Sequence, residues 1–107
     1  TINAIKNKTK TTTTTTTKYT FTKTLKLGQK GEDVKQLQKF LNNNGFPVST
    51  TGPGSKGNET LLFGPATQRA VIKFQEAYAK DVLTPSGLKK GTGTFGPATL
   101  KKVNNFK

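Results

Sequence analysis

The chain has 107 residues, of which 18 are Lys or Arg and 5 are Asp or Glu, so its net charge is +13. This length predicts one domain with a modest core, and no apolar run approaches the roughly 18 residues of a membrane span. Cysteine and histidine are absent, which excludes a disulfide framework, a cysteine nucleophile and a histidine base. The lysine excess is compatible with an anionic environment, such as a wall polymer, and equally with lysines that only keep a small extracellular domain soluble.

Residues 1–24 form a tail rich in threonine and lysine, with no acidic residue. Threonine is β-branched and favours extended backbone, so we predict an extended tail or linker that precedes a folded domain over residues 25–107. Apolar and polar residues alternate in part between residues 19 and 27, which is a strand pattern; the apolar ones are Tyr19, Phe21, Leu25 and Leu27.

Seven consecutive threonines stand in this tail. Tracts of this composition are typical of disordered or O-glycosylated linkers. The candidate glycosylation sites are Thr11, Thr12, Thr13, Thr14, Thr15, Thr16 and Thr17. Because the first residue is Thr1 and not Met, we expect either a processed chain or a fragment, and for a secreted protein we expect that the signal peptide has been removed.

Apolar spacing predicts three helices, over residues 32–44, 65–79 and 97–104. Acidic Glu32 and Asp33 suit the start of the first helix, and Gly45 suits its end. The other two helices each begin at a Pro that follows a Gly. Long loops connect them, and the predicted core contains Leu37, Leu41, Val71, Phe74 and Leu100. The expected fold is all-α, a compact three-helix bundle with long loops.

The chain contains an internal repeat. The segment Phe63-Gly64-Pro65-Ala66-Thr67 recurs further along the chain as Phe95-Gly96-Pro97-Ala98-Thr99. Two copies are too few for a solenoid. We interpret the unit as a helix start that is used twice, in which the aromatic residue packs inward and Gly turns the chain.

Several of these residues occur together in a known family. They are Leu27-Gly28, Gly31-Glu32-Asp33-Val34, Leu37-Gln38, Leu41, Gly45, Phe63-Gly64, Thr67, Ala70-Val71, Phe74-Gln75, Gly93, Phe95-Gly96 and Thr99. In this order they make residues 25–107 resemble the bacterial peptidoglycan-binding domain. The resemblance implies a three-helix accessory module of wall hydrolases, carboxypeptidases or surface proteins that is not itself catalytic.

Residues that could perform catalysis are scarce. Glycan hydrolysis needs two carboxyl groups that face a cleft, and the acidic residues are Glu32, Asp33, Glu59, Glu76 and Asp81. The first two suit the helix dipole, and Glu76 precedes Lys80 by one helical turn as a surface pair. We therefore expect no enzyme activity, no metal site and no cofactor.

For ligand binding, six polar residues on the predicted helices are candidates: Gln38, Thr67, Arg69, Lys73, Gln75 and Thr99. Arg69 could bind a carboxylate through two hydrogen bonds. The two threonines stand in first helical turns, where a hydroxyl can either cap the helix or contact a sugar.

Three functions are compatible with these features. The first is a non-catalytic module of a secreted or cell-wall-associated protein that binds peptidoglycan or another wall glycan. The second is a structural subunit of an extracellular fibre, in which the tail docks as a strand on neighbouring copies of the chain. Nucleic-acid binding is the third and least favoured, since Arg69 is the single arginine and only Tyr19 and Phe21 stand among basic residues for base stacking.

Overall fold

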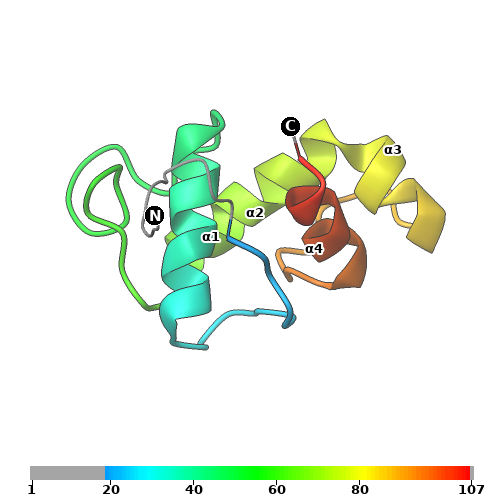
Figure 1. Cartoon of the computed structure of the whole chain (residues 1–107). Helices are drawn as coiled ribbons and strands as arrows, with labels where there is room; N and C mark the ends of the chain where they lie inside the picture. Colours follow the sequence, from blue (N-terminus) through cyan, green and yellow to red (C-terminus); the bar gives the residue numbers. More distant parts are fainter. Residues whose placement is uncertain (1–18, 107) are drawn as a thin grey trace, which may run out of the picture.

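The computed structural model describes residues 19–106, which form a helical domain (Figure 1). The helices are α1 (Glu32–Asn43), α2 (Pro65–Ala77), α3 (Ala79–Val82) and α4 (Pro97–Asn104), with a 3₁₀ turn η1 (Thr84–Ser86). Helix α1 packs against α2, and α3 contacts both α2 and α4. The predicted all-α fold is confirmed. Over residues 19–106, no helix is long and apolar enough to cross a membrane.

The predicted helix boundaries agree closely with the three longer helices. Helix α1 ends as its sequence indicated, since Gly45 has a φ of 89° and the Phe46 N–H reaches back to the Leu41 carbonyl at 2.9 Å. The second predicted helix is interrupted at Tyr78, which separates α2 from α3. Most of α3 and all of η1 lie in a region that was predicted to be loop.

The core forms where α1, α2 and α4 meet. Of the predicted core residues, Leu37, Leu41, Val71 and Phe74 are buried, and Leu100 is partly buried against them. An aromatic cluster surrounds Phe74, whose ring centroid lies 5.0–5.9 Å from those of four other rings. Aromatic rings at these separations stabilise a core beyond their buried area. The four neighbours are Phe40, Phe46, Tyr78 and Phe106.

The segment before α1 holds the two copies of the repeat together. Leu25 and Phe95 exchange two backbone hydrogen bonds, of 3.0 and 2.8 Å. Further along the same segment, the Phe63 N–H donates to the Gln29 carbonyl at 2.9 Å, and the Gly28 N–H donates to the Phe63 carbonyl at 2.8 Å. One extended segment therefore pairs with the start of both repeated units.

The strand predicted from residue 19 to residue 27 is wrong. Within residues 19–106 there are only isolated bridges, of which Leu25 with Phe95 is one. Phe21 and Leu25 are both buried, whereas Leu27 is 50% exposed, so the inward positions do not follow the alternation of a strand. The alternation fails because tertiary contacts with α4, and not a neighbouring strand, fix this segment.

Phe21 belongs to the core although it precedes the predicted domain boundary at residue 25. Its N–H and C=O both bond to the Asn104 side chain, at 2.8 and 2.9 Å, and its ring meets that of Phe95 edge-on at 5.0 Å. The Tyr19 hydroxyl donates to the Asp33 carboxylate, and this hydrogen bond raises the pKa of Tyr19. The candidate glycosylation sites lie outside the described residues.

Candidate functional site

The six predicted ligand residues do not come together as one site. Arg69 and Lys73 lie on α2, one helical turn apart, and neither belongs to the buried face of that helix. The other four are almost completely buried, and they form two separate pairs: Gln38 with Thr67, and Gln75 with Thr99. Their role in ligand binding stays a prediction, but their hydrogen bonds reveal how two pockets of the domain are built.

The first buried pair is part of a network that we call the Gln38 node, made of Gln38, Thr60, Leu62 and Thr67. The Gln38 side-chain N–H₂ donates to the Thr67 hydroxyl at 2.9 Å, the Leu62 carbonyl at 3.0 Å and the Thr60 hydroxyl at 3.3 Å. Its side-chain carbonyl accepts from the Thr60 N–H at 2.6 Å. A residue on α1 therefore fixes the chain that leads into α2.

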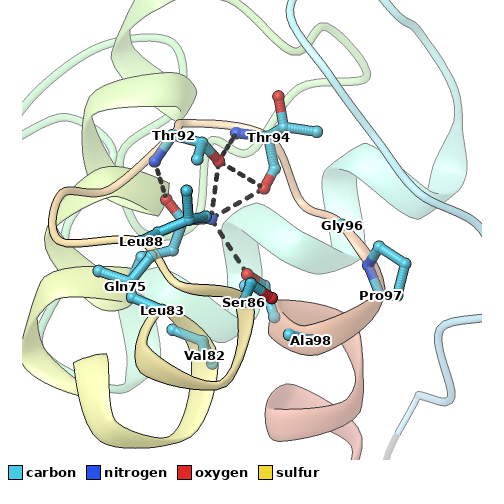
Figure 2. Close-up of a pocket in the computed structure, with 11 residues that line it drawn as sticks. Gln75, Val82, Leu83, Ser86, Leu88, Thr92, Thr94, Gly96, Pro97 and Ala98 are labelled. Atoms are coloured by element: carbon cyan, nitrogen blue, oxygen red, sulfur yellow. Dashed lines mark hydrogen bonds between the residues drawn. The ribbon is translucent and has the colours of Figure 1, made fainter.

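The second network, the Gln75 node, is made of Gln75, Thr92, Gly93, Thr94 and Thr99. Figure 2 labels three of these residues, Gln75, Thr92 and Thr94. The Gln75 N–H₂ donates to the Thr99 hydroxyl at 3.0 Å, the Thr94 carbonyl at 2.8 Å and the Thr92 hydroxyl at 3.2 Å. Its carbonyl accepts from the N–H groups of Thr92 and Gly93, at 2.8 and 3.0 Å. A residue on α2 thus fixes the chain that leads into α4.

The two nodes are copies of each other. Three residues of the first node have counterparts in the second at the spacing that separates Phe63 from Phe95: Thr60 and Thr92, Leu62 and Thr94, Thr67 and Thr99. The repeat therefore extends beyond the Phe-Gly-Pro-Ala-Thr unit. In the first node a Gln on α1 donates to a threonine hydroxyl in α2, and in the second a Gln on α2 donates to a threonine hydroxyl in α4. Buried polar groups of this kind are satisfied in folded proteins. Sequence reasoning missed the nodes, although the matching Thr60 and Thr92 were a visible signal.

A small pocket opens beside each node. The pocket beside the Gln75 node has a volume of about 140 Å³ (Figure 2), and the pocket beside the Gln38 node has a volume of about 160 Å³. Pockets that bind drug-sized ligands have volumes of roughly 300–1,000 Å³. Each pocket therefore has room for a short side chain or one amino-acid residue, and not for a large cofactor.

The walls of the two pockets differ. Beyond the node, the Gln75 pocket is closed by apolar and hydroxyl side chains from α3 and η1 and the residues that follow them: Val82, Leu83, Ser86 and Leu88. The Gln38 pocket is closed instead by the loop after α1, through Val48, Pro53 and Gly54. Neither pocket is lined by an acidic or basic residue, so each would select its ligand by shape and neutral hydrogen bonds.

The loop after α1 also carries a wider groove of about 570 Å³, which is lined mostly by polar residues and includes Lys56. The Asn42 side chain organises this loop, because it accepts from the Val48 N–H at 2.8 Å and donates to the Gly54 carbonyl and the Glu59 carboxylate at 2.9 Å. Burial raises the pKa of Glu59, but bonds from Asn42 and backbone N–H groups, with nearby Lys39, outweigh it and lower the pKa.

The described residues contain no group of three metal-ligating side chains. Each of the five carboxylates in residues 19–106 has a partner. Glu59 bonds Asn42, Glu32 accepts from Gln36, and Glu76 accepts from a backbone N–H. The remaining two form ion pairs, Asp33 with Lys23 at 4.0 Å and Asp81 with Lys102 at 2.7 Å.

Two comparisons agree with this architecture. Residues 30–103 match the family described as "Putative peptidoglycan binding domain", a range that includes both nodes. The chain is also 40% identical over 80 residues to the zinc D-Ala-D-Ala carboxypeptidase of Streptomyces albus G. That match covers 75% of this chain but 26% of the enzyme, so the chain spans about a quarter of its relative's length. The chain belongs to the peptidoglycan-binding domain family.

Proposed function

We propose that this chain is a non-catalytic module that holds a secreted or surface protein on peptidoglycan. The observation that carries this proposal is the family match over residues 30–103, which includes every residue of the two nodes. The lysine excess supports the same function, because a net charge of +13 attracts the chain to anionic wall polymers.

The Gln75 pocket is the contact that we propose for the peptide part of the wall. Its volume of about 140 Å³ is below the range of pockets that bind drug-sized ligands, roughly 300–1,000 Å³, and suits a short peptide segment. Leucine and valine side chains supply apolar contacts, and Ser86 and Thr94 line the pocket with groups that can bond a peptide backbone. The relative is a D-Ala-D-Ala carboxypeptidase, so a stem peptide that ends in D-alanine is the ligand we favour.

The absence of catalysis is proposed on chemical grounds. The sequence has no cysteine or histidine, and neither node pocket is lined by a carboxylate. Hydrolysis of an amide or a glycosidic bond needs a nucleophile, a metal-bound water or paired carboxyl groups at the reacting atom. The alternative of a fibre subunit depends on the tail of residues 1–24, of which residues 1–18 lie outside the described residues, and it stays a prediction from sequence.

Co-sedimentation with purified peptidoglycan sacculi tests the proposal. The whole chain should pellet with sacculi, and Leu88→Asn should weaken binding about tenfold, because this half-exposed side chain lines the Gln75 pocket. Leu27→Asn is the matched control, since Leu27 is 50% exposed and lines neither node pocket. All three proteins carry the same charge, so adsorption through lysine is constant.

Two outcomes would overturn the proposal. Equal pelleting of the chain and of an unrelated protein with the same size and charge would remove specific wall binding. Soluble sugar or peptide released from the sacculi would contradict the non-catalytic role.

A further inference from the structure

We propose that the domain has two peptide-binding sites, the second being the pocket beside the Gln38 node, and that it binds the wall bivalently. This inference rests on the proposed function, because it assigns to the second pocket the same class of ligand. The evidence is the correspondence between the two pockets, residue by residue.

Seven lining positions of one pocket have a counterpart in the other. Gln38 corresponds to Gln75 as the amide that comes from the preceding helix. The other six pairs all share the spacing of the repeat: Thr60 and Thr92, Leu62 and Thr94, Gly64 and Gly96, Pro65 and Pro97, Ala66 and Ala98, Thr67 and Thr99. Six of the seven pairs are identical residues, so the repeat reproduces the pocket together with the helix start.

The backbone at the two pocket mouths is also the same. Gly64 has φ −99° and ψ −174°, and Gly96 has φ −90° and ψ −172°. No side chain caps the helix at either glycine. A methyl group at Gly96 would meet no atom within 4 Å, and at Gly64 it would meet only the Leu62 side chain, at 3.8 Å. The backbone therefore enters α2 and α4 with the same geometry, and the space beside each glycine is largely open.

The one pair of lining residues that differs, Leu62 and Thr94, predicts different ligand preferences for the two pockets. Where Thr94 lines the Gln75 pocket, the larger apolar residue Leu62 lines the Gln38 pocket. The added wall of the Gln38 pocket is Val48, Pro53 and Gly54, which carries no side-chain hydroxyl, whereas Ser86 adds one to the other pocket. We expect the Gln38 pocket to favour the more apolar residue of a stem peptide.

Two sites on one small domain change how it binds a polymer. Peptidoglycan presents many copies of its stem peptide, so the second contact forms within a complex that already exists. Linked contacts of this kind strengthen overall binding by roughly 10²–10⁴-fold over one contact. Weak individual pockets, each the size of one residue, can then still retain a protein on the wall.

Matched substitutions at the rims of the two pockets test this proposal. Leu62 is 45% exposed and lines the Gln38 pocket, and Leu88 is 42% exposed and lines the Gln75 pocket, so Asn at either position spares the core. The variants are Leu62→Asn, Leu88→Asn, the double variant and the Leu27→Asn control. Circular dichroism verifies that each folds. The probe is a soluble disaccharide-peptide released from sacculi by a muramidase, titrated calorimetrically or by amide chemical shifts.

The whole chain and the control should bind two equivalents of this probe, each single variant one, and the double variant none. On intact sacculi, each single variant should bind at least tenfold more weakly than the whole chain. One equivalent in the whole chain, lost in Leu88→Asn and unchanged in Leu62→Asn, would overturn the second site while leaving the proposed function intact. Failure of the whole chain to bind sacculi specifically would instead overturn the proposed function.

Discussion

In both halves of the domain a buried Gln fixes the start of a later helix, but the chain that connects the Gln to that helix differs between the halves. In the first half, 22 residues separate Gln38 from Thr60, and a loop clamped by Asn42 fills the interval. In the second half, 17 residues separate Gln75 from Thr92, and α3 and η1 fill it. The hydrogen bonds at the end of each interval nevertheless correspond, except that the Gln75 carbonyl accepts from one more backbone N–H group, that of Gly93. The node fixes the helix start, and the connection that leads to it is free to change in length and structure.

The largest expected effect concerns the buried aromatic residue of each repeat. Phe63→Ala and Phe95→Ala should each destabilise the domain by about 3–5 kcal/mol, because both rings are fully buried. Phe95→Ala should cost about 1 kcal/mol more, since Phe95 also loses its edge-on contact with Phe21. Urea unfolding measures both.

If the alanine variants are unfolded in water, Phe63→Leu and Phe95→Leu preserve the comparison with a smaller loss of volume. If the Phe63 variant lowers the free energy of unfolding as much as the matching Phe95 variant does, the stabilising contact between Phe21 and Phe95 is contradicted.

The next effect concerns the two node glutamines. A Gln→Met substitution keeps most of the side-chain length and removes the side-chain hydrogen bonds. Gln75→Met leaves two backbone N–H groups, those of Thr92 and Gly93, without this acceptor. Gln38→Met leaves one, that of Thr60, without its acceptor. A buried group without a partner costs about 1–3 kcal/mol. Both variants should be destabilised, with the larger loss in Gln75→Met. Thermal unfolding at one pH ranks them, and the reverse order would show that the nodes are not built as described.

The smallest effect is the sensitivity to acid that Glu59 gives to the first half. The pKa of Glu59 is lowered from its ordinary value of 4.5. Its contribution to stability is therefore present above pH 4.5 and is lost as the pH falls through the folded-state pKa. The repeat places Gly91 at the equivalent position of the second half. A Cβ atom there would lie 2.8 Å from the Ile72 carbonyl oxygen, so the second half has no room for an equivalent carboxylate.

Amide exchange, followed from neutral pH into the acid range, measures this difference. Residues near the Asn42 clamp should lose protection in acid before the residues around Gln75 do. Glu59→Gln should flatten the pH dependence in the first half and leave the second half unchanged. Equal losses in both halves would contradict this assignment.

Much of this fold could be predicted from sequence because its helices are marked by local signals. The apolar spacing through Leu37 and Leu41 located α1, Gly45 located its end, and the Gly-Pro pairs located the starts of α2 and α4. The burial of Phe21 could not be predicted, because it depends on Asn104, which is 83 residues away. Helix α3 spans only Ala79–Val82, too short for a periodic pattern.

The candidate site was predicted less well for a physical reason. Gln38, Thr67, Gln75 and Thr99 were chosen as polar residues on helices, but a polar residue in a sequence gives no sign of whether its partner is ligand or protein. The structure gives each of the four a protein partner. The sequence does contain the constant spacing of the repeat, which also relates Thr60 to Thr92. That spacing could have indicated that both nodes are structural.

The segment that joins both repeats has a consequence for folding. Repeat proteins usually add stability unit by unit, since each unit contacts only its neighbours. Here residues 25–29 form backbone hydrogen bonds with both Phe63 and Phe95. Phe21 forms its hydrogen bonds with the side chain of Asn104, 83 residues further along the chain. Such non-local contacts slow folding, because distant segments must meet before either gains stability. We therefore expect one cooperative transition, with no stable half-domain, and a nascent chain that cannot complete its core until the last helix has been made.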